Sequence, residues 1–286
     1  MVSRIRCRQI DRADIDALVD LLTRGFRVRT RDFWVRALRR LEQHSTPQGF
    51  PKYGYLLECN GMPVGVILLI YSFIAVHQEM RIRCSVSSWY VEPPFRSYAA
   101  LLRSHALKHK QVTYFNITPN LDTLPILEAQ GYVRYCDGRF VAAPALSFNT
   151  GHSKATLVIS DTYTTLDLPA LETKLLLDHT SYGCISVICN SRNQSYPFVF
   201  LPLRKSRIVR YAYLAYCRDL EEFVRFARPL GQFLIRRGFP LVLVDSNGPI
   251  KRLAGRYFGQ FPKYFKGPDQ PRLGDIAYSE RVMFGL

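Results

Sequence analysis

This sequence of 286 residues has no long apolar run and no paired cysteines. Its longest apolar stretch, Val64 to Val76, is too short to cross a bilayer, and the first residues lack the hydrophobic run of a signal peptide. The seven cysteines are scattered, odd in number and never spaced as Cys-x-x-Cys, so they indicate neither a metal site nor a disulfide framework. We therefore expect a cytoplasmic protein that does not span a membrane and holds no metal ion.

Acidic residues are also few. Asp and Glu total 23 against 39 Lys and Arg, which gives a formal net charge of +16. A field of this sign attracts anions such as phosphorylated cofactors, nucleic acid or an acidic membrane surface, and sign alone does not choose among them. The remaining composition, with 48% hydrophobic and 22% charged residues, is typical of a globular protein, and the length allows two domains.

Hydrophobic periodicity in the first half predicts alternating strands and helices. Two apolar runs flank Asn60-Gly61, a pair that tolerates the positive φ of a tight turn and so predicts a hairpin. Around this turn we expect strands at 4–10, 55–59, 64–76, 81–91, 112–117, 132–135 and 138–142, and helices at 15–26, 31–42, 97–110 and 121–130.

A small, polar segment from Pro144 to Lys154 predicts a linker, after which the order of elements loosely repeats. Here we expect helices at 171–178 and 220–237, and strands at 184–189, 197–203, 211–216 and 240–245. The strand, turn, helix, strand plan of 89–117 recurs in 214–245 with slight identity. The sequence thus predicts an α/β (α+β) protein with two tandem domains, 1–145 and 146–286, each a mixed, mostly antiparallel sheet flanked by helices.

The turn from strand 81–91 into the following helix carries a specific motif. Four of its residues follow in a fixed order: Val91, Pro93, Phe95 and Arg96. Asn120 comes after the next strand, and the helix beyond it ends in Gly131-Tyr132. This pattern resembles the GNAT superfamily of acyl-CoA-dependent N-acyltransferases, and the resemblance covers roughly residues 4 to 142. The second half looks like a degenerate copy of the same fold.

The resemblance implies acetyl-CoA or another acyl-CoA as co-substrate, and a small-molecule amine or a peptide as acceptor. The residues that it places on the cofactor are Trp89, Val91, Arg96, Ser97, Tyr98, Ala99, Ala100 and Asn120. A loop that opens a helix presents several backbone N–H groups in one direction, and the helix dipole adds positive potential for a pyrophosphate. Catalysis then rests on the proximity of amine and thioester and requires no metal.

The loop departs from the family pattern in ways that bear on mechanism. Both usual glycines are missing between Arg96 and Leu101, and Leu101 is bulky where a phosphate would approach. Leu127 stands where the family commonly has a Tyr general acid, which makes its neighbour Glu128 a candidate catalytic residue. No Asp or Glu lies in the latter part of strand 81–91, where a general base is usual, so Tyr90 is the second candidate.

Two alternatives stay open. The missing glycines and the missing Tyr also suit a non-catalytic protein that keeps the GNAT fold for binding. The other alternative is a nucleic-acid or tRNA-associated protein, since basic and aromatic residues interleave in the C-terminal part. These residues are Arg225, Arg228, Arg236, Arg237, Lys251, Arg252, Arg256, Lys263, Tyr264 and Lys266. The loop 217–223 of the second half places three carboxylates where a phosphate would lie, so we expect that half to be structural.

Overall fold

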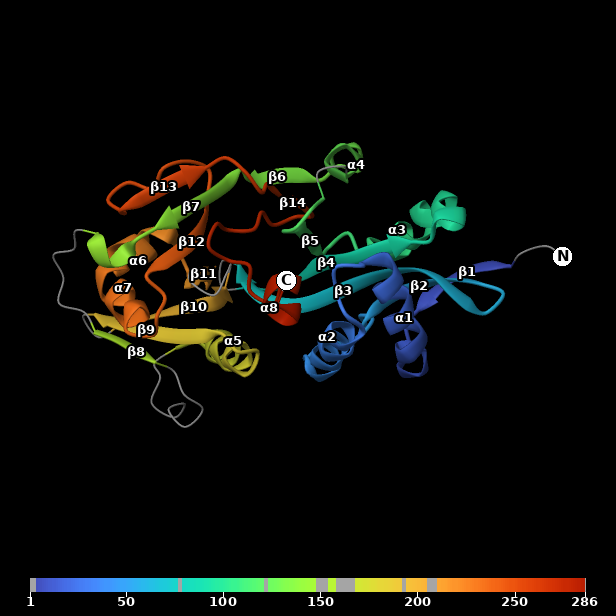
Figure 1. The fold of residues 1–286 in the computed structure, drawn as a ribbon, viewed down its shortest axis with the longest axis horizontal. Coiled ribbons are helices and arrows are strands. Elements are labelled where there is room, and N and C mark those ends of the chain that lie inside the picture. Colours follow the sequence, from blue (N-terminus) through green and yellow to red (C-terminus); the bar gives the residue numbers. More distant parts are fainter. Residues whose placement is uncertain are drawn as a thin grey trace. The chain divides into compact units, whose positions relative to one another are not determined.

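The computed structural model describes residues 4–76, 79–120, 123–147, 154–157, 168–191, 194–204 and 210–285. The chain divides into two compact units. The first unit comprises Met1–Asn116, Lys266–Asp269 and Tyr278–Leu286, and the second comprises Ile117–Phe265 and Gln270–Ala277. Each unit combines strands and helices (Figure 1), which confirms the predicted α/β class.

The sheet of the first unit has the strand order β1-β2-β3-β4-β5. Its strands are β1 (Ile5–Gln9), β2 (Gly54–Cys59), β3 (Met62–Val76), β4 (Glu79–Val91) and β5 (Thr113–Asn116). Neighbouring strands are antiparallel except for β4 and β5, which are parallel. The predicted hairpin of β2 and β3 is confirmed, and its turn residues Asn60 and Gly61 both adopt positive φ.

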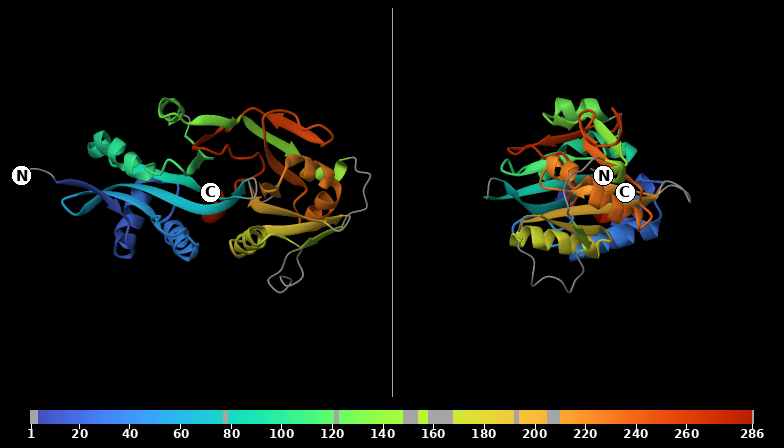
Figure 2. Two further views of the ribbon diagram at one scale, coloured as in Figure 1. Left: turned by 180° about the vertical axis from the view of Figure 1, so that it is seen from behind. Right: turned by 90° about the vertical axis from the view of Figure 1, so that its left-hand side faces the viewer.

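Helices cover both faces of this sheet. On one face lie α1 (Ile15–Gly25), α2 (Arg31–Gln43) and the short α8 (Glu280–Phe284), and on the other lies α3 (Ala99–Ala106) (Figures 1 and 2). Thr30 caps α2, because its side chain accepts a hydrogen bond from the Phe33 N–H. Since both faces are covered, β3 is buried without alternation from Val64 to Ser72, which explains its continuous apolar run.

The second unit contains a sheet with the order β13-β7-β12-β11-β10-β9-β8, in which only β11 and β12 are parallel, and the antiparallel pair β6 and β14. Its strands are β6 (Val133–Cys136), β7 (Gly138–Ala142), β8 (Lys154–Leu157), β9 (Ile185–Ser191), β10 (Gln194–Arg204), β11 (Arg210–Tyr216), β12 (Leu241–Ser246), β13 (Gly255–Phe258) and β14 (Lys263–Lys266). Its helices are α4 (Leu124–Ala129), α5 (Ala170–Ser181), α6 (Leu220–Arg225) and α7 (Ala227–Ile235). The core packs Phe198 and Phe200 of β10 against Phe223 and Phe226.

Two expectations need correction and two stay open. The helix expected over 220–237 is two helices, because Pro229 has no N–H to donate to the preceding turn. Strand 138–142, expected to complete the first half, is β7 and pairs with β12 and β13, a choice of partner that its own five residues do not encode. Part of the expected linker, 148–153, lies outside the described residues. The domain limits 1–145 and 146–286 stay a prediction.

An ion-pair cluster ties β1 to β2. Arg8 donates hydrogen bonds to Asp14 at 2.6 and 2.7 Å and to Glu58 at 2.7 Å, and Arg6 donates to Glu58 at 2.9 Å. The hydrogen bonds from Arg8 lower the pKa of both Asp14 and Glu58. A carboxyl pKa that is lowered in the folded state stabilises the fold above its ordinary value, and this stabilisation is lost as the pH falls through the lowered value.

We therefore expect Arg8→Gln to lower the free energy of unfolding by about 2 kcal/mol at pH 7, and by much less under acid conditions in which both carboxylates are protonated. Urea unfolding of the wild type and the variant, at neutral and at strongly acid pH, measures the difference. Arg12→Gln is the matched control, because Arg12 pairs with Glu42 at 3.3 Å with 87% of its side chain exposed. An effect of Arg8→Gln that is equal under both conditions would contradict the ion-pair explanation.

Candidate functional site

A bulge interrupts β4 near its end. Ser87 lies opposite Leu68 and Tyr90 lies opposite Val66, so Ser88 and Trp89 together oppose the single residue Ile67. Ser88 adopts a φ of 49°, in the left-handed region that a bulge often assigns to glycine. Such a bulge bends its strand and disrupts the local ladder.

The bulge lies just beyond the point where β4 and β5 stop pairing. Their parallel ladder joins Arg83–Ser85 to Thr113–Phe115, and β4 then continues to Val91 without β5, still paired with β3. Two parallel strands that part in this way leave backbone N–H and C=O groups of β4 without a partner in β5. The arrangement offers a strand edge inside the sheet to which an extended, amide-containing ligand can hydrogen bond.

The chain then turns into α3 through a 3-10 helix, η2 (Pro93–Tyr98). The N-cap residue of α3 is Tyr98, whose side chain makes no capping hydrogen bond, and the N–H of Ala99, the first residue of the helix, donates to the Arg96 carbonyl of η2. The later N–H groups of the first turn therefore have no side-chain cap. Arg96 is exposed, and no carboxylate of the described residues forms an ion pair with it. An uncapped helix start beside a free cation is suited to an anion.

The structure gives different surroundings to the predicted residues of β4. Tyr90 packs against the end of α1, with its ring 6.1 Å from that of Phe26 and so close to Gly25 that a Cβ there would lie 2.5 Å from the Tyr90 ring. Trp89 is half-buried, and its indole N–H is buried with no acceptor among the described residues. Val91 is buried and pairs with Gly65. Within the first unit, these three residues directly precede the loop that carries Arg96, Ser97, Tyr98, Ala99 and Ala100.

Asn120 and Glu128 belong to the second unit. Asn120 is exposed, and its backbone carbonyl accepts hydrogen bonds from the N–H and the hydroxyl of Thr123. Glu128 is exposed on α4 and accepts a hydrogen bond from the Tyr264 hydroxyl at 2.8 Å. Burial, and next this hydrogen bond, raise the pKa of Tyr264. The contact with Tyr264 was not foreseen, and the predicted roles of Asn120 and Glu128 stay predictions.

A carboxylate that the sequence analysis did not single out lies against β4. Glu280, the first residue of α8, accepts a hydrogen bond of 2.5 Å from the Ser85 hydroxyl, and both residues are almost fully buried. The two residues are separated by 195 positions, so no local pattern could join them. The only available signal was a negative one, namely the lack of Asp and Glu in the latter part of the strand itself.

The second unit repeats the local plan of β4. Val199 lies opposite Tyr216 and Phe200 opposite Leu214, which makes Ala215 the extra residue of a bulge in β11. The parallel pairing of β11 with β12 likewise ends just before this bulge, at Tyr213. A loop with Asp219 then leads into α6, as η2 leads into α3.

In the second unit, however, side chains of the unit itself fill the point at which β11 and β12 stop pairing. Lys263 of β14 donates a hydrogen bond to the Tyr213 hydroxyl at 2.6 Å and another to Asp245, and Tyr213 also donates to Asp245. All three residues are almost fully buried, and burial lowers the pKa of Lys263. This Lys263 network lies where β11 and β12 part, and the structural role expected for the second half stays a prediction.

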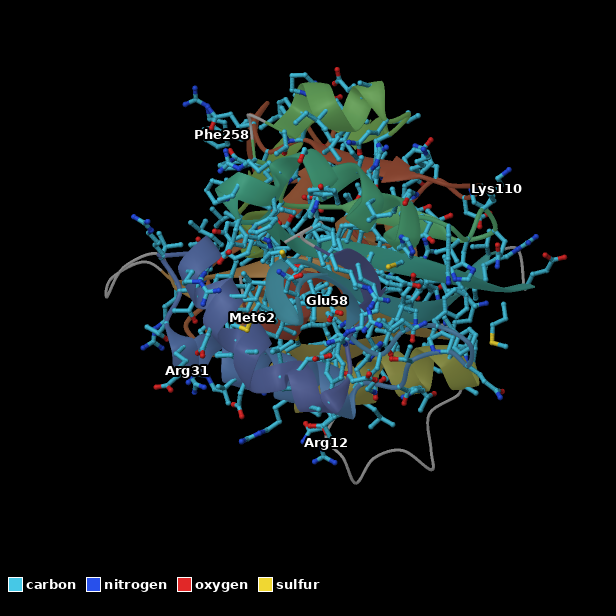
Figure 3. All side chains as sticks on the ribbon, turned by 90° about the vertical axis from the view of Figure 1, so that its right-hand side faces the viewer. Arg12, Arg31, Glu58, Met62, Lys110 and Phe258 are labelled. Atoms are coloured by element: carbon cyan, nitrogen blue, oxygen red, sulfur yellow. The ribbon has the colours of Figure 1, made fainter. Side chains whose placement is uncertain are left out.

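Basic residues of the two units lie on several separate elements. In the first unit Arg12, Arg31 and Lys110 project in different directions from separate elements (Figure 3). In the second unit Arg237 lies 3.8 Å above the ring of Phe233, and Arg225 lies over Tyr196 and Phe226. Several arginines therefore cover aromatic rings of their own unit, a packing role that the sequence pattern did not distinguish from a nucleic-acid surface.

Two searches of the described residues bear on other kinds of site. No group of three or more His, Cys, Asp or Glu is placed to hold a metal ion in the ranges that the structure describes. Nor does any helix within those ranges have the length and apolar character needed to cross a membrane.

Comparison with known proteins supports the fold. A scan against protein-family models finds no match, and neither does a search of curated proteins. Solved structures do match over nearly the whole chain. A GCN5-related N-acetyltransferase from Anabaena variabilis superposes with a TM-score of 0.59 at 11% identity, covering 92% of this chain and 72% of its own. Eis1 from Mycobacterium abscessus superposes with a TM-score of 0.54 at 11% identity, covering 96% of this chain and 74% of its own.

Proposed function

Because the chain has the fold of the GCN5-related N-acetyltransferases, we propose that its first unit binds an acyl-CoA and transfers the acyl group to an amine. The observation that carries the proposal is the parting of β4 from β5 at Ser85, followed by the bulge at Ser88 and the uncapped start of α3. A fold alone does not assign an activity, whereas this local geometry is suited to an extended ligand that carries a pyrophosphate.

The proposed binding mode follows from the chemistry of the cofactor. The pantetheine arm has amide groups along an extended chain, and it hydrogen bonds to β4 between Ser85 and Val91 as an added strand would. The pyrophosphate lies at the first turn of α3, beside the loop Arg96–Ala100, with Arg96 as a counter-charge. The thioester then lies beside Trp89 and Tyr90, and reaction requires an amine held against it.

Binding of acetyl-CoA tests this proposal. At a concentration of about 100 times its dissociation constant, a ligand of the folded state adds roughly 2.7 kcal/mol to the free energy of unfolding. We expect Arg96→Ala to weaken binding about tenfold, which reduces that stabilisation to about half. Thermal unfolding with and without acetyl-CoA, CoA and a medium-chain acyl-CoA measures both effects.

The control for charge is Arg36→Ala. Arg36 is an exposed arginine of α2, on the face of the sheet opposite α3, and the described residues offer it no ion-pair partner. This variant loses the same charge and is expected to bind acetyl-CoA as the wild type does. Equal weakening by both variants would mean that only net charge matters, and no stabilisation of the wild type by any of the three ligands would overturn the acyl-CoA proposal.

The second candidate is a GNAT-fold protein that binds without catalysis. It is favoured by Leu127, a buried aliphatic side chain where the family commonly has a Tyr, and by Leu101, which is 36% exposed at the start of α3. A release assay separates the two candidates. A transferase frees the thiol of CoA when an amine is added to acetyl-CoA, whereas a binding protein is stabilised by acetyl-CoA and frees none.

We also propose that the second half is a degenerate copy of the first. The supporting observation is the repeated bulge, at Ser88 in β4 and at Ala215 in β11, each just beyond the end of a parallel ladder. On this proposal the second half contributes no acyl-CoA site, because the Lys263 network occupies the place where its strands part.

A further inference from the structure

The buried face of β4 is unusually polar. Ser85 and Ser87 alternate along the strand and therefore point to the same face, the one covered by α1, α2 and α8. Both are at most 5% exposed, at positions where a buried strand ordinarily has Val or Ile. Burying hydroxyl groups is unfavourable unless they are hydrogen bonded, so the hydrogen-bond partners of these two serines indicate the role of this face.

These hydroxyls connect the bulge to a carboxylate. The Ser87 hydroxyl lies 3.0 Å from that of Ser88, the residue at the bulge. Two residues along the strand, Ser85 donates its hydrogen bond of 2.5 Å to Glu280. The direction of that bond is the one a proton relay requires, because a hydroxyl that donates to a carboxylate can accept a proton on its other side.

Two more hydroxyls in this region are buried without any hydrogen-bond partner among the described residues. Ser279 directly precedes Glu280 and is 0% exposed, and Ser72 lies opposite Arg83, which shares the face of Ser85. Buried polar atoms without a protein partner are the usual places of ordered water. Both hydroxyls are therefore suited to bind internal water, Ser279 next to Glu280 in the chain and Ser72 on the face of the sheet that carries Ser85.

The position of Glu280 is fixed by the C-terminal segment of the chain. The Tyr278 ring lies 5.2 Å from that of His44, and Arg40 of α2 donates a hydrogen bond to the Met283 carbonyl at 3.3 Å. These contacts hold α8 against the sheet on either side of the carboxylate. The chain thus supplies from its end the acidic group that is missing from the latter part of β4 itself.

We infer that Glu280 accepts the proton that the acceptor amine loses, and that Ser87, Ser85 and internal water carry the proton to it. This inference rests on the acyl transfer proposed above. An ammonium group gives one proton to the relay and becomes a nucleophilic amine. Its nitrogen attacks the thioester carbonyl carbon, the C–N bond forms, the C–S bond breaks, and a second nitrogen-bound proton passes to the departing thiolate. Glu280 then releases its proton to solvent.

The other charged groups around this carboxylate are known from the elements packed on it. They are Arg83 on β4, Arg40 on α2, His44 directly after α2, and Arg281 on α8 itself. Arginines keep their charge throughout the useful pH range, whereas histidine is the residue type that ordinarily changes charge near neutrality, so His44 is the group that a control must separate from Glu280. His44→Gln is therefore the variant that separates a histidine titration from that of Glu280.

The test is the pH dependence of thiol release from acetyl-CoA, with glucosamine and a lysine-containing peptide as amine probes. We expect Glu280→Gln to lower kcat/KM by 10²- to 10⁴-fold at neutral pH, and the loss to shrink as the pH approaches the pKa of the free amine, where no base is needed. Glu280→Asp keeps a carboxylate and should retain the acidic limb of the profile. Ser85→Ala should show the same pH-dependent loss as Glu280→Gln, with thermal unfolding confirming that each variant is folded and still stabilised by acetyl-CoA.

The outcomes are distinguishable. A Glu280→Gln variant with an unchanged pH profile, or with the same loss at every pH, would overturn the relay while leaving the acyltransferase proposal intact. Loss of the acidic limb in His44→Gln rather than in Glu280→Gln would also overturn it. A wild-type protein that binds acetyl-CoA and releases no thiol with either amine would overturn the transferase proposal, and the relay with it.

Discussion

Replacing Lys263 with Met is expected to lower the free energy of unfolding by about 3–5 kcal/mol, the largest effect on stability that we predict for a single side chain. The substitution removes the cation and leaves Asp245 charged, almost fully buried and bonded only to the Tyr213 hydroxyl among the groups of this network. An unpaired charge in such surroundings has lost its hydration without compensation. Urea unfolding at neutral pH measures the loss.

Two further variants separate the network from general effects of mutation. Lys251→Met removes an exposed lysine from the same unit and is expected to change stability by less than about 0.5 kcal/mol. The triple variant Lys263→Met, Asp245→Leu, Tyr213→Phe removes every polar group of the network at once and should recover most of the lost stability, because a buried polar network often contributes little relative to apolar packing. A loss below about 1 kcal/mol for Lys263→Met alone would show that Asp245 is not left as a buried charge.

The elements of the fold were predictable where the information is local. The hairpin of β2 and β3 follows from two apolar runs around Asn60-Gly61, and the amphipathic stripes of α1 and α2 follow from the spacing of their apolar residues. The break between α6 and α7 is also encoded locally, because Pro229 has no N–H to donate to the carbonyl of Arg225, whereas the apolar stripe alone predicts one continuous helix.

What could not be predicted depends on pairings across long sequence distances. β7 is apolar and short, and nothing in its residues states that its neighbours are β12 and β13. The Lys263 network joins one ordinary residue from each of three strands. In the sequence Lys263 was grouped with exposed basic residues, whereas it is fully buried, because local charge pattern carries no information about burial.

The candidate site likewise contains features that are local in the sequence and features that depend on distant residues. The motif that ends in Arg96 lies within a few consecutive residues, so the strand, loop and helix that carry it were located from the sequence, although the helix ends at Ala106 rather than at residue 110. The bulge could not be located from the sequence. Gly or Asn at position 88 would have indicated positive φ, but Ser gives no such indication. Glu280 was missed because its contact with Ser85 spans most of the chain.

Removal of the bulge in β4 is expected to have the second large effect, a loss of acetyl-CoA binding. Deleting Ser88 leaves Trp89 alone opposite Ile67, which restores a regular ladder between Ser87–Leu68 and Tyr90–Val66 and removes the bend of β4. We expect the protein to remain folded, because the deletion also removes a non-glycine residue from the left-handed region. We expect acetyl-CoA binding to weaken at least 100-fold, since the β4 edge and the loop after it are no longer turned toward the ligand. In thermal unfolding, a stabilisation of about 2.7 kcal/mol at 100 times the wild-type dissociation constant would fall to about 0.4 kcal/mol.

Two matched variants decide whether such a loss comes from the bulge. Ser88→Gly keeps the extra residue and relieves the strain of positive φ, so it should bind acetyl-CoA normally and gain about 1 kcal/mol of stability. Deleting Ala215 removes the equivalent bulge from β11, where the Lys263 network already fills the place at which the strands part, so acetyl-CoA binding should persist. If deletion of Ser88 left binding intact, the parting of β4 and β5 would not depend on the bulge. If deletion of Ala215 abolished binding in a folded protein, β11 would take part in acyl-CoA binding, and the proposal that the second half contributes no acyl-CoA site would have to be abandoned.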